Sequence, residues 1–163
     1  MAAKIVETEA YFGNGEDPAS HAHKGPTQRS AIMFGQPGCA YVYFNYGVHW
    51  LLNFVAKRNG TAGAVLIRAV RPVEGLELML KNRPTQASNL TNGPGKLTRA
   101  LGIDDSYNGA DITNEKSDLY VTSFITSQFN VITAGRIGIN KGREKMLRFY
   151  VKDNAFVSRP FRH

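Results

Sequence analysis

Two glutamates near the start of the chain share one face of a predicted strand. Segment 5–11 alternates β-branched or small residues with Glu7, Glu9 and Tyr11, and residues two apart in a strand point to the same side. Such an acid pair is either a solvated strand edge or a carboxylate over a cleft that acts as a general base. The spacing alone favours the solvated edge, and the ring of Tyr11 on the same face shifts the balance only slightly.

Segment 41–50 is rich in aromatic residues. Strand alternation places Tyr41, Tyr43 and Asn45 on one face, and Tyr46–Gly47 then forms the tip of a turn. Part of this set belongs to an aromatic core. The functional alternative is a wall on which nucleobases stack, worth about 1–3 kcal/mol per base, with an exposed aromatic wedge at the turn.

Asn53 and Arg68 interrupt strands that are otherwise apolar. Buried polar groups need partners, and a buried arginine needs an anion. Arg68 either forms a structural ion pair with Glu7 or Glu9, holds a phosphate, or orients a carboxylate and its water. The sequence alone does not separate these roles.

The run Asn92-Gly93-Pro94-Gly95-Lys96 resembles a phosphate contact, with free backbone N–H groups at a helix start followed by a lysine. Its spacing is not that of a Walker P-loop. We predict that Gly93, Gly95 and Lys96 contact the phosphate backbone of a nucleic acid. Further candidate phosphate contacts are Arg29, Lys24 and Arg136.

His21 and His23 lie near Asp17, but their spacing matches no zinc pattern and Cys39 is the only cysteine. We therefore predict no metal site and no cofactor. A histidine placed for hydrogen bonding or stacking is at least as reasonable an interpretation of this loop.

Composition indicates one globular domain with a polyanionic partner. The 163 residues are 42% apolar and 20% charged, and the net charge of +7 suits nucleic acid. No stretch approaches the roughly 20 apolar residues of a membrane helix. We expect no secretion signal, no membrane partner, and a location in the cytoplasm with the nucleoid or in the nucleus.

The apolar residues fall in short runs, which predicts strands mixed with a few helices. We expect strands at 5–11, 40–46, 48–56, 62–70, 119–123 and 147–151, a short helix over 27–34, a helix from Pro72 to about Lys81, and another from Pro94 to Leu101. Short connections favour antiparallel pairing. The predicted fold is a single α+β domain with a curved, mostly antiparallel β-sheet surrounded by helices.

Taken together and in order, segments 5–11, 41–47, 65–69, 92–97 and 147–151 resemble the alkyladenine (3-methyladenine) DNA glycosylase family. The resemblance covers nearly the whole chain. It implies a monomeric base-excision-repair enzyme that binds double-stranded DNA, rotates an alkylated or deaminated purine into a pocket, and hydrolyses its N-glycosidic bond, the base-flipping strategy.

The same resemblance implies a role for each site residue. Glu9 is the general base that activates water, and Arg68 helps to place both. The flipped base lies among Tyr11, His21 and Tyr43, while Tyr46 fills the gap in the DNA. Asn53 lies at the pocket floor and screens out the exocyclic amine of guanine. No lysine suggests a Schiff base, so a monofunctional glycosylase without lyase activity is expected.

Two departures from the family are visible. The family carries a further N-terminal stretch before the strand of Glu9, so residues 1–163 are expected to be a single glycosylase domain that lacks this segment. The residues after the wedge, Val48-His49-Trp50, also differ from the family pattern. An alternative function is therefore a nucleic-acid-binding protein of the same fold without turnover. A glycosidase for free sugars is disfavoured, because Glu7 and Glu9 share one strand and cannot easily flank a bond.

Overall fold

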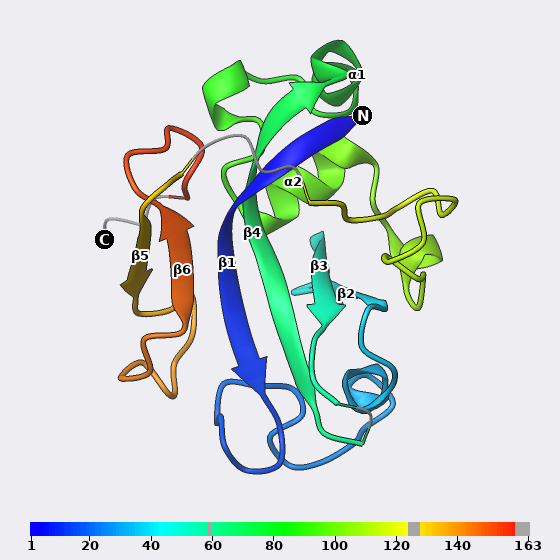
Figure 1. Ribbon diagram of the computed structural model, residues 1–163, viewed down its shortest axis with the longest axis vertical. Coiled ribbons are helices and arrows are strands. Elements are labelled where there is room, and N and C mark those ends of the chain that lie inside the picture. The colour runs from blue at the N-terminus through cyan, green and yellow to red at the C-terminus, as the bar shows by residue number, and fades with distance from the viewer. Residues whose placement is uncertain (59, 124–127, 159–163) are drawn as a thin grey trace.

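In the computed structural model, which describes residues 1–58, 60–123 and 128–158, six antiparallel strands form one open sheet of order β2-β3-β4-β1-β6-β5. The strands are β1 (Ala2–Phe12), β2 (Ala40–Asn45), β3 (His49–Val55), β4 (Gly63–Glu74), β5 (Val131–Ala134) and β6 (Arg148–Val151). The long strands β1 and β4 run side by side through the molecule (Figure 1). The predicted α+β class with an antiparallel sheet is confirmed.

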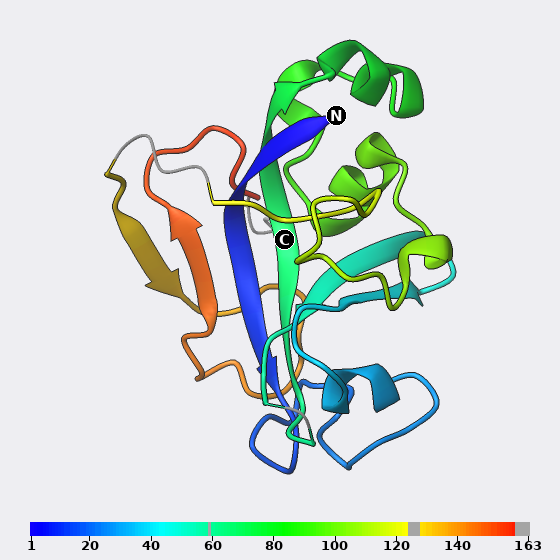
Figure 2. The same cartoon turned by 45° about the vertical axis from the view of Figure 1, so that its right-hand side comes forward.

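Two helices, α1 (Leu76–Asn82) and α2 (Pro94–Leu101), lie on one side of the β1–β4 pair, while β5 and β6 extend from the other (Figure 2). Three short 3-10 helices complete the described elements: η1 (Ala31–Phe34), η2 (Ala87–Asn89) and η3 (Asp105–Tyr107). The helix predicted to open at Pro94 is confirmed. The helix predicted over 27–34 is reduced to η1.

Strand β1 is paired on both sides. It runs antiparallel to β4 from Ala2 opposite Glu74 to Phe12 opposite Gly63, and its Glu7–Glu9 portion also pairs with β6. The interpretation of Glu7 and Glu9 as a solvated strand edge is therefore wrong. Both carboxylates lie where three strands meet, and neither is more than 1% exposed.

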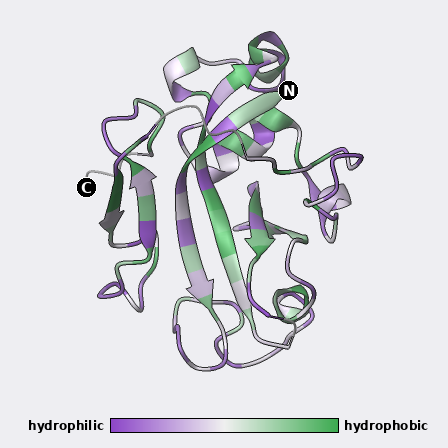
Figure 3. Ribbon diagram, in the orientation of Figure 1, coloured by the Kyte–Doolittle hydropathy of each residue, from purple (hydrophilic) through white to green (hydrophobic). Residues whose placement is uncertain are grey.

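One face of the sheet is apolar and packs against α2. Buried side chains from four elements form this core: Val42, Leu52, Ile67, Val70 and Leu97 among others. β4 is mostly apolar along its length, whereas polar residues recur along β1 (Figure 3). Because successive side chains of a strand point to opposite faces, the residues that alternate with this apolar core form a second row on the other face of the sheet.

That second row crosses the sheet as aligned pairs. Tyr41 lies opposite Asn53, Asn53 opposite Leu66, and Leu66 opposite Glu9. Glu9 in turn lies opposite Arg148. Directly paired residues point to the same face of a sheet, so the register gathers an aromatic ring, an amide, a carboxylate and a guanidinium from four strands.

Two predicted elements differ from the structure, and one strand is not predicted from the sequence. Pro72 does not open a helix; it pairs with Ala3 inside β4, and Gly75, with φ +75°, ends the strand before α1. Segment 119–123 is not a strand, although Val121 N–H donates to the Ile112 carbonyl. The sequence also gave no sign of β5, a four-residue strand whose Val131 is 52% exposed.

A leucine pair on the two helices tests where stability resides. Leu97 in α2 is fully buried, whereas Leu78 in α1 is 56% exposed. We expect Leu97→Ala to lower the free energy of unfolding by about 2–5 kcal/mol, because it leaves a cavity under the sheet. Leu78→Ala is the matched control, with a change of about 0.5 kcal/mol or less in urea denaturation. Equal losses in the two variants would contradict this packing.

Candidate active site

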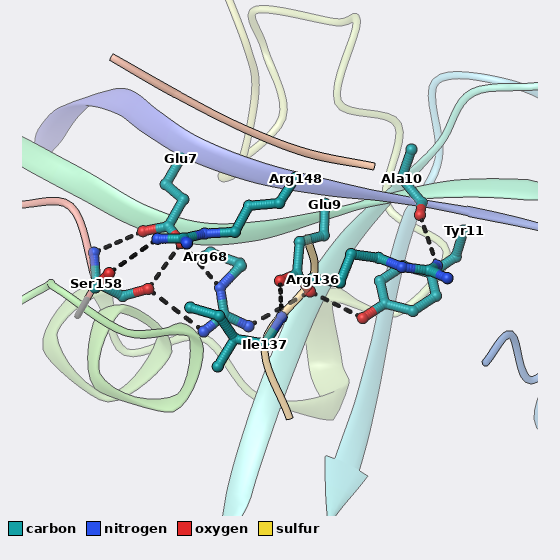
Figure 4. Close-up of polar contacts among 9 residues, drawn as sticks. All are labelled: Glu7, Glu9, Ala10, Tyr11, Arg68, Arg136, Ile137, Arg148 and Ser158. Atoms are coloured by element: carbon teal, nitrogen blue, oxygen red, sulfur yellow. Dashed lines mark hydrogen bonds and ion pairs between the residues drawn. The ribbon is translucent and has the colours of Figure 1, made fainter. Parts of the chain in front are cut away.

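Glu9 is fully buried and held by three groups from different parts of the chain (Figure 4). Its Oε1 accepts a hydrogen bond from the Ile137 backbone N–H at 2.8 Å, and its Oε2 accepts one from the Tyr11 hydroxyl at 2.8 Å. Arg68 Nη1 lies 3.4 Å from Oε2. These three contacts fix the position of the Glu9 carboxylate.

Glu7 is the second buried carboxylate and has more partners. Its Oε1 accepts from Arg68 Nε at 3.0 Å and Arg148 Nε at 2.7 Å, and the Ser158 hydroxyl donates to it at 2.7 Å. Ser158 N–H donates to Oε2 at 2.6 Å. Of the alternatives for Arg68, the structure shows the ion pair, and it involves both glutamates.

A third buried anion, Asp17, pairs with Arg136. The guanidinium reaches both carboxylate oxygens, with Nη2 donating to Oδ1 at 2.7 Å, and it also donates to the Ala10 carbonyl at 3.0 Å. Burial alone would raise the pKa of Asp17, but the hydrogen bonds from Arg136 hold it below its usual range. The prediction that Arg136 contacts phosphate is wrong, because both side chains are 0% exposed and this arginine is committed to Asp17.

The Asp17–Arg136 pair also fixes Tyr11. The Arg136 guanidinium lies 4.5 Å from the centre of the Tyr11 ring, within range for a cation–π contact. Burial and the neighbouring Glu9 raise the pKa of Tyr11, so its hydroxyl stays protonated and donates a hydrogen bond to Glu9.

Three predicted pocket or wall residues form one aromatic cluster. The rings of His21 and Tyr43 meet edge to face with centroids 4.7 Å apart, and Tyr41 lies 5.1 Å from Tyr43. His21 Nδ1 and the Tyr41 hydroxyl share a hydrogen bond of 2.9 Å. Burial raises the pKa of Tyr43 to about 12, and burial followed by the nearby Arg29 lowers the pKa of His21. The cluster is therefore electrically neutral near pH 7.

Arg29 lies beside these rings, with its guanidinium carbon 5.7 Å from the Tyr43 centroid. A pocket of about 310 Å³ opens here on β2, lined by Gln28, Arg29, Tyr41, Val42, Tyr43 and Asn108. Arg29 and Lys24 are both exposed, so both remain available to a polyanion.

Asn53 is buried, and its amide donates to the Tyr41 carbonyl at 3.1 Å across the β2–β3 pair. The register places it two strands from Glu9 on the same face. It therefore lies between Tyr41 and Glu9 in this row of paired residues.

The β2–β3 hairpin ends in an exposed tyrosine. Tyr46 and Gly47 have φ angles of +51° and +67°, and Val48 N–H donates to the Asn45 carbonyl at 3.1 Å. Two central residues with positive φ define the tight hairpin turn of type I′, where a bulky residue is disfavoured. Tyr46 is nevertheless present and 89% exposed, which makes it a candidate for a functional contact.

The lysine of the predicted phosphate contact at α2 forms hydrogen bonds within the protein. Lys96 Nζ donates to the side chains of Asn89 and Asn92 at 2.5 and 2.8 Å. Gly95 allows the ring of His49 to approach, since an added Cβ would lie 2.6 Å from the ring. Gly93 is the residue that precedes α2. Backbone contact by these three residues stays a prediction.

Within ranges 1–58, 60–123 and 128–158, no group of three or more His, Cys, Asp or Glu side chains is arranged to hold a metal ion. The same described residues contain no helix long and apolar enough to cross a membrane.

Four residues of the site were not found from the sequence. Arg148, Ser158 and Ile137 contact the glutamates from more than 125 positions away in the chain, and Asp17 was considered only beside the histidines. One signal was available, since Arg148 interrupts the predicted strand 147–151 as Arg68 interrupts its own.

Comparison with known proteins identifies one family. Residues 1–155 match the family model described as methylpurine-DNA glycosylase. A protein of Prosthecochloris aestuarii named "Putative 3-methyladenine DNA glycosylase" is 51% identical over 157 residues, which cover 95% of this chain and 74% of that protein. One of the same name from Carboxydothermus hydrogenoformans is 46% identical over 161 residues, covering 98% and 83%.

Removing the Asp17 carboxylate tests the second ion pair. We expect Asp17→Asn to lower the free energy of unfolding at pH 7 by about 3–5 kcal/mol, because Arg136 is left as a buried charge without its anion. The folded-state pKa of Asp17 is depressed, so its stabilisation is present above about pH 4 and is lost as pH falls through the folded value. The gap between wild type and variant should therefore narrow in acid.

Urea denaturation at pH 7 and at pH 3 measures this effect. Asp118→Asn, at an exposed position, is the control and should change stability little at either pH. A gap that is the same at both pH values would exclude the ionised Asp17 as its source.

Proposed function

This chain belongs to the methylpurine-DNA glycosylase family, and from that premise we propose that it excises alkylated or deaminated purines from duplex DNA with a water molecule that Glu9 activates. The coarser role follows from the family: a 3-methyladenine DNA glycosylase of DNA repair. One observation carries the finer proposal, namely that a buried carboxylate bonded to Tyr11 lies on the same sheet face as an aromatic cluster.

The chemistry needs one base and little acid. An alkylated purine is often cationic, so it departs readily and leaves a sugar with oxocarbenium character. Glu9 can take a proton from water and offset that positive charge. Among the residues that the structure describes, three groups contact Glu9, fewer than the roughly four lone-pair sites of a carboxylate, and in this proposal water takes the remaining site.

The aromatic residues suit a flipped base. Tyr11, His21 and Tyr43 offer electron-rich faces, and a cation over such a face gains about 0.5–2 kcal/mol. The lowered pKa of His21 keeps its ring neutral near pH 7, so it does not repel a cationic purine. We assign Asn53 to the pocket floor, where its amide can oppose the exocyclic amine of guanine.

The exposed hairpin supplies the means to hold the base outside the duplex. Tyr46 stands clear of the protein surface on a tight turn, and it would fill the space that the flipped nucleotide vacates. Arg29, which lies beside the aromatic cluster, and the exposed Lys24 would contact phosphates, together with Gly93, Gly95 and Lys96. Contact by Lys96 requires that it exchange its bonds to Asn89 and Asn92.

The proposed enzyme is a monofunctional, monomeric glycosylase that needs no cofactor. Alkali should therefore be required to cleave the strand after base release. The alternative, a DNA-binding protein of the same fold without turnover, predicts retention of the lesion base.

Glu9→Gln is the first test. Glutamine preserves the shape of the side chain but removes the base, so we expect base release to fall at least about 100-fold while binding of lesion DNA persists. Duplex oligonucleotides that carry 1,N6-ethenoadenine, hypoxanthine or 3-methyladenine are incubated with protein and then treated with alkali. Glu16→Gln, in an exposed loop, is the matched control and should retain activity. Tight binding with no base release by the wild type would establish the alternative function.

Tyr46→Ala tests the wedge. We expect base release from duplex DNA to fall roughly 10-fold, consistent with the loss of one stacking contact, while release from a single-stranded lesion changes little because no duplex must be opened. Tyr120→Ala removes another exposed tyrosine, 47% accessible, and serves as the control. An equal loss on single-stranded and duplex substrates would exclude the wedge role.

A further inference from the structure

Arg68 contacts the carboxylates of both Glu7 and Glu9, and its contact with Glu7 is the shorter of the two. Its Nε donates to Glu7 at 3.0 Å, whereas its nearest approach to Glu9 is a 3.4 Å contact from Nη1. A bidentate arginine–carboxylate pair would be shorter and stronger. Glu7 thus takes the better of the two contacts, although Glu9 is the residue beside the aromatic cluster.

Glu7 can hold Arg68 because other hydrogen bonds fix the position of the Glu7 carboxylate. Arg148 Nε and both donors of Ser158 hold its carboxylate, and its side chain is 0% exposed. Ser158 also accepts from both arginines, through its hydroxyl from Arg68 and its carbonyl from Arg148. These contacts join β1, β4, β6 and the segment after β6 around a single anion (Figure 4).

We propose that Glu7 is a positioning residue for base excision: it holds Arg68 away from a full ion pair with Glu9 and so keeps Glu9 basic enough to take a proton from water. This proposal rests on the proposed function. Without Glu7, Arg68 would turn both nitrogens of its fork toward Glu9, because a buried guanidinium cannot be left without an anion. A carboxylate in a full arginine pair binds a proton less readily.

The groups that face Glu9 come from every element around it. They are Tyr11 on the same strand, Arg68 on β4, Tyr43 on β2, and Arg136 and Ile137 in the segment after β5. Arg148 on β6 also lies opposite Glu9, and its hydrogen bonds go to Glu7 and Ser158. Arg136 already has Asp17 as its partner. Arg68 is therefore the cation whose hold on Glu9 depends on Glu7.

The test compares Glu7→Gln with the double variant Glu7→Gln/Arg148→Gln. Both variants remove the carboxylate of Glu7 that Arg68 contacts. The double variant removes one negative and one positive charge, so it preserves the net charge of the cluster. We expect the acidic limb of the single-turnover pH–rate profile to move to lower pH by about one unit in both variants, since Glu9 then stays ionised further into acid. The rate on the neutral plateau should fall about 10-fold, with affinity for lesion DNA unchanged.

The double variant separates this mechanism from its alternatives. If Glu7 acted only through its charge, the acidic limb would return to the wild-type position in the double variant. If Glu7 acted only in folding, thermal denaturation would shift while the limb stayed in place. Either result overturns the proposal. Glu16→Gln is the control for the chemical change and should alter neither limb nor plateau.

A second measurement does not depend on activity. Carboxyl-carbon NMR of protein labelled at glutamate, with Glu9→Gln to assign the signal, follows protonation of Glu9 in the absence of DNA. A midpoint that moves to lower pH in both Glu7 variants supports the proposal, and an unmoved midpoint rejects it. A wild-type protein that releases no base would refute the proposed function, yet this titration would still show whether Glu7 controls Arg68.

Discussion

The burial of two carboxylates side by side on β1 is the constraint on which the rest of the site depends. Removing a charge from water costs several kcal/mol unless a partner and hydrogen bonds compensate for it. β4 and β6 therefore each place an arginine against β1, and the Ile137 N–H and the Ser158 N–H complete the shell of donors. The sheet order, with β1 between β4 and β6, is what brings these donors together.

The second ion pair extends the same logic to the loops. Arg136 joins the segment after β5 to Asp17 in the loop after β1, and its guanidinium lies over Tyr11. The ring that touches Glu9 is thus fixed by a charge pair and by its strand. Tyr46, in contrast, stands free on a tight hairpin. The proposed base flipping would depend on both parts, the rigid carboxylate site and the exposed aromatic tip.

Local signals identified the residues that repeat a pattern or break one. Alternation placed Glu7, Glu9 and Tyr11 on one face, the tight turn put Tyr46 at a tip, and Arg68 stood out inside an apolar strand. The family resemblance built on these segments is confirmed by the comparisons. The prediction of a helix that begins at Pro72 is wrong, because pairing with Ala3 continues β4 past the proline.

The sequence by itself determined the α+β class, the family, and the residue types available for chemistry, since these depend on periodicity, composition and the order of segments. Only the tertiary structure decided which charges meet. Arg148, Ser158 and Ile137 reach the glutamates across long separations in the chain, and no local pattern encodes such a contact. The tertiary structure also shows Arg136 in a buried ion pair with Asp17 and not at a phosphate contact, because three-dimensional packing sets the partner of a charge.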